Sequence, residues 1–192
     1  MKIPTKKEKG LWESIDTTND SWGFAKSDSN WKSPKDIIQN LISVVSKGGT
    51  YMLNIGPKED GSIPILAKNT LEQTGTEILK YKEIIYGSKP SPFTSSFSWG
   101  DCVTKDTDLY VFVTNKSAPN RIILPGVTSK VTSAELLNSK IPVTIKQNDL
   151  YLKCDLPQNN NDELLQVVKI SFSEKPKEFS SALLVDGINE TT

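Results

Sequence analysis

The pattern of hydrophobic and polar positions changes near residue 90 of this 192-residue chain. Before that point, apolar residues recur at helical spacing or form short continuous runs. After it, short apolar segments alternate with Gly, Pro, Asn and Asp, which is typical of strands joined by tight turns. The junction at 87–93, Gly-Ser-Lys-Pro-Ser-Pro-Phe, carries two prolines that disfavour a helix. We therefore predict two domains, residues 1–88 and 89–192.

In the first domain, the pattern predicts a helix, a buried strand and a second helix. Ser33 is a good N-cap, Pro34 suits the first helical position, and an apolar stripe follows over 37–45. The nearly continuous apolar run at 51–55 is typical of a strand that is buried on both faces of a parallel sheet. A second helix is expected over 65–81. These elements amount to about two βα units, which is only part of a closed (β/α)8 barrel.

In the second domain, the pattern predicts short strands that are rich in β-branched and aromatic residues. The expected strands are 109–113, 121–124, 143–145, 150–154 and 167–172. Strands of this length and spacing, separated by turn residues, indicate an antiparallel β-sandwich.

Composition argues against several classes of partner and cofactor. With 23 basic and 23 acidic residues, the formal net charge of zero gives little electrostatic support for binding nucleic acid or a membrane. No apolar run approaches the roughly 20 residues that a membrane-spanning helix needs. Because the chain has no histidine, Cys102 and Cys154 cannot complete a zinc site, and we expect no cofactor or metal. These two cysteines fit buried thiols better than a disulfide. Hydrolytic chemistry would have to rest on carboxylates, since histidine is the commonest general base.

Three segments of the first domain carry long motifs. Residues 12–24 contain Trp-Glu-Ser and then Asn-Asp-Ser-Trp-Gly-Phe. Residues 45–57 read V-S-K-G-G-T-Y-M-L-N-I-G-P, and D-G-S-I-P follows at 60–64. A third pattern of Leu, Gly and Ile-Tyr-Gly extends over 71–87. Together, these motifs resemble the α-L-fucosidases of glycoside hydrolase family 29, and the resemblance covers residues 11–88.

Some positions depart from the family pattern. Thr50 stands where the family usually has Asn, and Ile15 stands where it has Cys. Glu77 replaces a usual Trp, and Tyr-Lys at 81–82 replaces a common Asn-Gly. None of these changes falls in the core of a motif, and they are typical of a divergent copy or of one under relaxed selection.

The resemblance implies a catalytic (β/α)8-like barrel followed by a C-terminal β-sandwich. It also implies retaining hydrolysis of α-L-fucosides by an Asp nucleophile and a carboxylic acid/base, which need about 5–5.5 Å between their carboxyl groups. In the family, the nucleophile precedes the Trp-Glu motif, but Glu8 is the only acid before Trp12 here. The family's sugar-binding histidines have no counterpart either. We therefore expect a C-terminal portion that is inactive alone and whose partners are the rest of the barrel and a fucosylated glycan.

Three residues are candidates for the sugar site. Glu13, from the Trp-Glu motif, would serve either as the acid/base or as an acid that supports its loop. Trp22 aligns with an aromatic residue that packs against the sugar in family members, and its alternative is a core tryptophan. Asn54 lies near the carboxyl end of an expected barrel strand, where barrel enzymes build their sites, but it also fits a residue that simply ends the strand.

Two other interpretations stay open. The sandwich could act as a carbohydrate-binding or structural module without catalysis, or the chain could derive from a decayed reading frame. The resemblance does not fix a cellular location, because family members are often secreted, periplasmic or lysosomal. No signal-peptide core is visible near the N-terminus of this sequence.

Overall fold

The computed structural model of the chain describes residues 1–5, 8–94, 96–115, 120–157 and 164–177. They form two compact units, each of which is described by itself. The first unit comprises Met1–Pro4 and Glu8–Gly87, and the second comprises Thr5 and the described residues from Ser88 onward. Within the described part of the chain, no helix combines the length and the hydrophobicity needed to cross a membrane.

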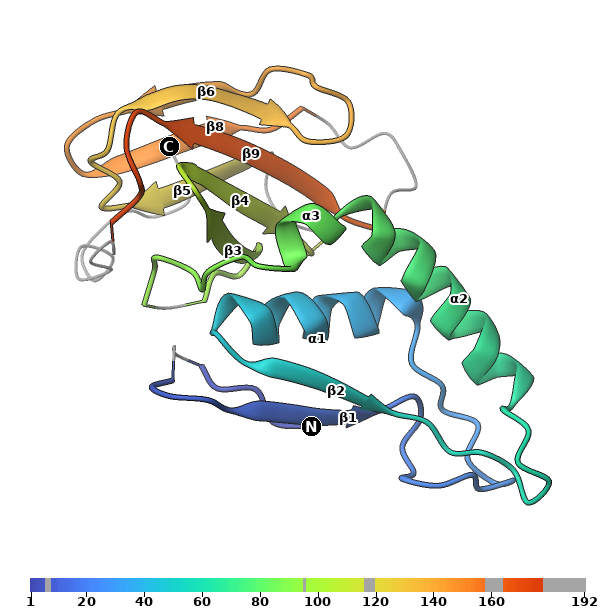
Figure 1. The fold of residues 1–192 in the computed structure, drawn as a ribbon. Helices are drawn as coiled ribbons and strands as arrows, with labels where there is room; N and C mark the ends of the chain where they lie inside the picture. The colour runs from blue at the N-terminus through green and yellow to red at the C-terminus, as the bar shows by residue number, and fades with distance from the viewer. Residues whose placement is uncertain (6–7, 95, 116–119, 158–163, 178–192) are drawn as a thin grey trace. The chain divides into compact units, whose positions relative to one another are not determined.

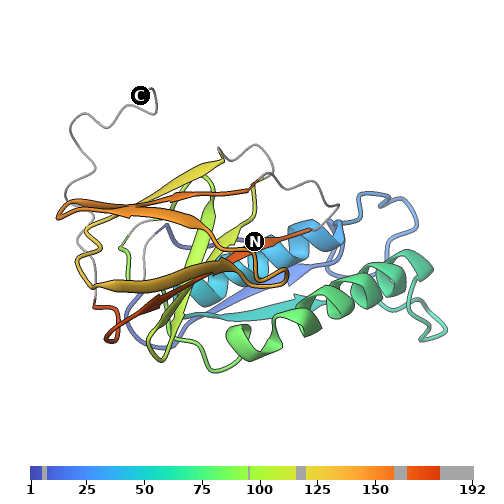
Figure 2. The same ribbon diagram turned by 90° about the horizontal axis from the view of Figure 1, so that it is seen from above.

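The first unit contains a parallel strand pair with helices beside it (Figure 1). Its elements are β1 (Glu13–Thr17), α1 (Pro34–Ser46), β2 (Thr50–Asn54), α2 (Ile65–Lys80) and α3 (Lys82–Ile85). β1 and β2 pair in register from Glu13 with Thr50 to Thr17 with Asn54, and α1 connects them as a βαβ crossover. Figures 1 and 2 both show α1 lying over one face of this pair. The predicted helices and the strand near 51–55 are confirmed, but the predicted burial of this strand on both faces is wrong, since Met52 is 46% exposed. β1 was not predicted.

The ends of α1 follow directly from the sequence. The Ser33 side chain accepts a hydrogen bond from the Asp36 N–H, and the Asp36 carboxylate accepts one from the Ser33 N–H, which together form a capping box. At the other end, Gly48 has a φ of 82°, in the left-handed region that favours glycine. The Gly49 N–H donates to the carbonyl of Val44 (3.0 Å), as in a Schellman motif.

Packing against Trp12 also requires a glycine at position 49. A Cβ on Gly49 would lie 2.4 Å from the ring of Trp12. The indole N–H of Trp12 donates to the carbonyl of Lys47 (3.3 Å), which keeps the ring against the helix end. The Trp-Glu motif and the Lys-Gly-Gly motif are therefore in direct contact.

The second unit consists of two antiparallel sheets. One has the strand order β3-β4-β9-β6 and the other has the order β5-β8-β7. The strands are β3 (Gly100–Lys105), β4 (Asp108–Val113), β5 (Arg121–Pro125), β6 (Val131–Leu136), β7 (Thr144–Gln147), β8 (Tyr151–Asp155) and β9 (Gln166–Phe172). This arrangement is consistent with the predicted β-sandwich. The five predicted strands correspond to β4, β5, β7, β8 and β9, and the pattern missed β3 and β6.

Side chains from both sheets build one hydrophobic core. Leu109, Val111, Ile122, Leu124 and Leu152 are all fully buried within it. Each such side chain contributes roughly 1.5–3 kcal/mol by leaving water. Both cysteines are also buried here and are free, as predicted. Burial is the main cause that raises the pKa of the Cys154 thiol to about 12, which is typical of an unreactive core thiol.

The packing of β3 against β4 can be tested at Gly100, the first residue of β3. Gly100 has a φ of 152°, and a Cβ there would lie 1.9 Å from the carbonyl oxygen of Phe112. We expect Gly100→Ala to destabilise the second unit by about 2 kcal/mol or more, because the neighbouring backbone would have to move. Urea unfolding followed by circular dichroism measures the change.

The matched control for Gly100→Ala is Gly75→Ala in α2, where an added Cβ meets nothing within 4 Å. This change should stabilise its helix by about 0.5–1 kcal/mol. Equal stability of Gly100→Ala and the parent chain would show that the β3–β4 packing is wrong.

Candidate functional site

Polar residues of the first unit gather where β1 and β2 end. Thr17 and Asn54 are register partners, and the Thr18 N–H donates to the carbonyl of Asn54 (3.2 Å). The chain leaves this point as a loop over residues 18–32, which we call the strand-end loop. It returns to its start, since the Lys32 N–H donates to the carbonyl of Thr18 (3.0 Å).

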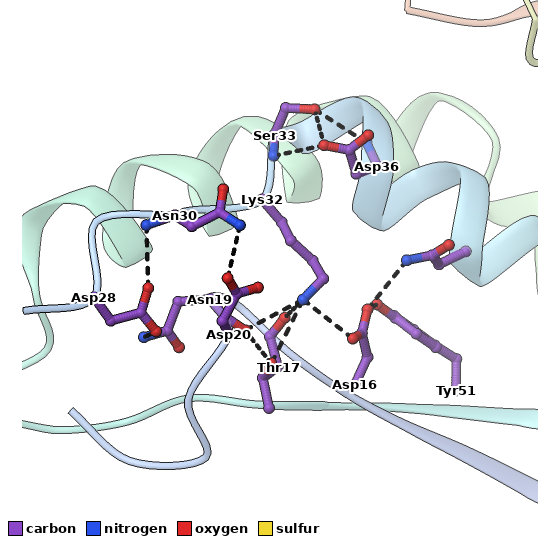
Figure 3. A network of polar contacts seen from close by, with 11 residues as sticks. Asp16, Thr17, Asn19, Asp20, Asp28, Asn30, Lys32, Ser33, Asp36 and Tyr51 are labelled. Carbon is purple, nitrogen blue, oxygen red and sulfur yellow. Dashed lines mark hydrogen bonds and ion pairs between the residues drawn. The ribbon is translucent and has the colours of Figure 1, made fainter. Parts of the chain in front are cut away.

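A buried carboxylate lies beneath this loop. Asp16, on the face of β1 toward α1, is only 3% exposed. Its side chain accepts hydrogen bonds from the Tyr51 hydroxyl (2.8 Å) and the Asn40 amide (3.1 Å), and it pairs with the Lys32 ammonium at 3.3 Å (Figure 3). These three partners come from β2, α1 and the end of the strand-end loop. One side chain of β1 therefore connects all three segments.

The contacts of Asp16 keep its carboxyl ionised. Burial pushes the pKa of Asp16 upward, but the Tyr51 hydrogen bond, the Thr17 backbone and the charge of Lys32 outweigh it, so the pKa lies below its ordinary value. Burial and the nearby carboxylate of Asp16 raise the pKa of Tyr51 well above its ordinary value. Asp16 is therefore a buried anion with its hydrogen bonds made, and it is poorly placed to attack or protonate a sugar.

The Lys32 ammonium also contacts the beginning of the strand-end loop. Its Nζ donates to the carbonyl oxygens of Thr17 (2.7 Å) and Asn19 (3.3 Å), in addition to its ion pair with Asp16. The side chain of Lys32 is 25% exposed, so water screens the pair only in part. Figure 3 shows this ammonium between the strand end and the carboxylate.

A second carboxylate organises the interior of the loop. Asp28 accepts hydrogen bonds from the Ser21 hydroxyl (2.6 Å), the Asn19 amide (2.9 Å) and the Asn30 N–H (3.1 Å). The Asn30 side chain donates to Asp20 (2.7 Å). The Ser21 hydrogen bond is the main cause that lowers the pKa of Asp28. The strand-end loop is therefore cross-linked by its own side chains.

The end of β2 meets the same loop. The Asn54 side-chain amide donates to the carbonyl of Trp22 (2.5 Å). A Cβ on Gly56 would lie 2.6 Å from the backbone of both Gly23 and Phe24, so only glycine permits this approach. The motif segments 12–24 and 45–57 therefore fold against each other at the strand ends.

The structure brings two of the three predicted site residues together. Trp22 and Asn54 are in contact, and the Trp22 side chain is 64% exposed, unlike a core tryptophan. Glu13 is exposed at the opposite, amino end of β1, where it pairs with Thr50. At about 3.3 Å per residue, the four steps from Glu13 to Thr17 span about 13 Å. The roles of all three residues in binding or catalysis stay predictions.

Sequence reasoning missed Asp16, Lys32 and Asp28. Asp16 lies in the segment E-S-I-D-T at 13–17, which was not predicted as a strand because it has a single apolar side chain. The charge of Asp16 was the only signal that the sequence offered for this site. Without β1, nothing indicated that Asp16 points toward α1. Among the described residues, no group of three or more His, Cys, Asp or Glu side chains is placed to hold a metal ion.

Comparison with known proteins agrees with these motifs. Residues 1–83 match the family model described as alpha-L-fucosidase. The tissue alpha-L-fucosidase of Macaca fascicularis is 28% identical over 176 residues, which cover 88% of this chain and 35% of the relative. The chain thus spans about a third of that relative's length.

Two solved structures extend the likeness across both units. The alpha-L-fucosidase of Vibrio sp. strain EJY3 is 27% identical with a TM-score of 0.81, and the alignment covers 92% of this chain and 32% of that one. Isoenzyme 1 of Paenibacillus thiaminolyticus is 27% identical with a TM-score of 0.75, covering 85% of this chain and 40% of that one. The family match over residues 1–83, the curated relative and the shared fold agree with the motifs that meet at the strand ends, and together they support an α-L-fucosidase family protein.

Proposed function

We propose that this chain is the C-terminal part of an α-L-fucosidase, a glycosidase that removes terminal α-L-fucose from glycans with retention of configuration. The observation that carries the proposal is the contact between segments 12–24 and 45–57, which presents an exposed Trp22 at the strand ends. Its substrate would be a fucosylated glycan. Residues 1–88 would complete a (β/α)8-like barrel, and residues 89–192 would form the sandwich that follows it.

The exposed surfaces of the strand pair support a barrel that extends beyond these residues. Ile15 and Met52 are register partners on the face away from α1, and they are 42% and 46% exposed. Among the described residues, β1 and β2 pair only with each other. Parallel strands are normally buried on both faces and paired on both edges, so further strands would cover these groups.

The carboxylates of the strand pair support a nucleophile from outside this chain. A retaining glycosidase needs two carboxyl groups about 5–5.5 Å apart across the glycosidic bond. Asp16 is buried and held by Tyr51, Asn40 and Lys32, and Glu13 lies at the far end of β1. In our proposal, this chain contributes an aromatic wall and an amide, and other barrel strands contribute the nucleophile.

The sandwich shows little that favours an independent carbohydrate-binding module. Such modules present flat aromatic faces to the sugar. Here Trp99, Tyr110, Phe112 and Phe172 are each less than a tenth exposed. These rings are better explained as core side chains of the second unit.

We expect the purified chain to show no hydrolysis of an aryl α-L-fucoside, because its strand pair offers no pair of opposed carboxyl groups. A complete α-L-fucosidase assayed in the same buffer is the positive control. Turnover by the chain that is abolished by Glu13→Gln would contradict the proposal and would make Glu13 the acid/base.

Trp22 gives a second test, in a complete α-L-fucosidase into which residues 12–32 are grafted, so that the whole strand-end loop is present. Fucose carries a methyl group at C5, and an indole face over it would bury some 40–80 Å² of apolar surface, worth roughly 1–2 kcal/mol. Trp22→Ala should therefore lower kcat/KM about five- to thirty-fold with little change in melting temperature.

The matched control is Trp31→Ala in the same loop, which should leave kcat/KM nearly unchanged. A core tryptophan would behave differently, since its loss costs about 3–5 kcal/mol of stability. A large fall in melting temperature for Trp22→Ala with unchanged kinetics would exclude Trp22 as a sugar contact.

A further inference from the structure

We propose that Asp16 and Lys32 form a positioning pair that fixes the strand-end loop and thereby sets the orientation of Trp22. The importance of this orientation for sugar binding rests on the proposed function. The positioning itself is a claim about the loop, and it can be tested without any sugar.

The carboxylate of Asp16 is the point where four segments meet. It belongs to β1, and its partners are Tyr51 on β2, Asn40 on α1 and Lys32 at the end of the loop. A buried carboxylate is stable only while its donors stay in place, so each of these segments is held in a fixed position. Asp16 is therefore a positioning residue and not a catalytic one.

The ammonium of Lys32 joins the two ends of the loop. Apart from Asp16, its close acceptors are uncharged oxygens of Thr17 and Asn19, which stand where the loop begins. Asp16 thus supplies the negative charge within reach of this cation. Without that charge, the ammonium would gain by turning toward water, and the loop would lose the link between its beginning and its end.

Polar contacts continue from this pair to Trp22. Asn19, whose carbonyl binds Lys32, also donates its side-chain amide to Asp28. Asp28, which is labelled in Figure 3, also accepts a hydrogen bond from the hydroxyl of Ser21, the neighbour of Trp22. On its other side, the Trp22 carbonyl is held by Asn54. Consecutive hydrogen bonds therefore connect the Asp16–Lys32 pair to the backbone on either side of the exposed Trp22 ring.

Fluorine NMR on the full 192-residue chain tests the proposal. The chain contains 4 tryptophans, and 5-fluorotryptophan labelling gives each a resonance that single Trp→Phe changes assign. In Asp16→Asn, we expect the Trp22 resonance to shift and broaden, and the amides of Thr18 and Lys32 to exchange with solvent at least tenfold faster. The Trp99 resonance, from the core of the second unit, should not change.

Ile42→Val is the matched control. Ile42 is a buried residue of α1 that makes no polar contact with the pair, so this change loosens the same unit without removing a charge. It should leave the Trp22 resonance in place. The proposal is wrong if Ile42→Val disturbs Trp22 as much as Asp16→Asn does, or if Asp16→Asn leaves Trp22 unchanged.

Two further variants keep the test decisive. Lys32→Met breaks the pair from the other side, and the double variant Asp16→Asn/Lys32→Met should exchange no faster than the faster single variant, because both remove one interaction. If the increases in exchange rate caused by the two single variants multiply in the double variant, Asp16 and Lys32 do not act as a pair.

If Asp16→Asn does not fold, Tyr51→Phe is the alternative variant. It removes one hydrogen bond to Asp16 and keeps the ion pair. It should speed exchange at Thr18 by about two- to tenfold, and an unchanged rate would overturn the proposal.

Failure of this inference and failure of the proposed function give different results. If Trp22 does not contact fucose, the NMR and exchange changes still occur. If those changes are absent while Trp22→Ala still lowers fucoside hydrolysis, the proposed function stands and the positioning pair is wrong.

Discussion

The burial of one carboxylate constrains the whole site. Asp16 lies under the ends of β1 and β2 with almost no exposure to water, so its charge must be met by donors from the surrounding segments. Tyr51, Asn40 and Lys32 meet it, and in doing so they hold β2, α1 and the strand-end loop against β1. The exposed ring of Trp22 is presented by a loop that this arrangement fixes.

Glycines explain why the two motif segments occur together. Gly49 admits the ring of Trp12, and Gly56 admits the backbone of Gly23 and Phe24. In both places a Cβ would overlap the facing segment, so the two segments can pack together only while these positions are glycine. The motifs are thus two sides of one packing contact, which fits their joint presence in a segment that matches the α-L-fucosidase family.

Local rules predicted the helices better than the site. Ser33-Pro34 and Gly48-Gly49 define α1 through capping, which depends only on neighbours in sequence. β1, β3 and β6 have too few regularly spaced apolar residues to be recognised alone. Trp22 was identified through resemblance, and Asn54 through its place at the end of an expected barrel strand. The pair of Asp16 and Lys32 was missed, because a contact across 16 residues depends on a strand that the pattern did not show.

The most direct test of the account is the activity of a chimera in which this whole chain replaces the aligned third of the Vibrio sp. strain EJY3 alpha-L-fucosidase. The account predicts that the chimera hydrolyses an aryl α-L-fucoside, whereas neither this chain nor the remaining Vibrio portion does so alone. A chimera with a native-like circular dichroism spectrum and a cooperative thermal transition, but no hydrolysis, would contradict the claim that this chain supplies the C-terminal part of an α-L-fucosidase.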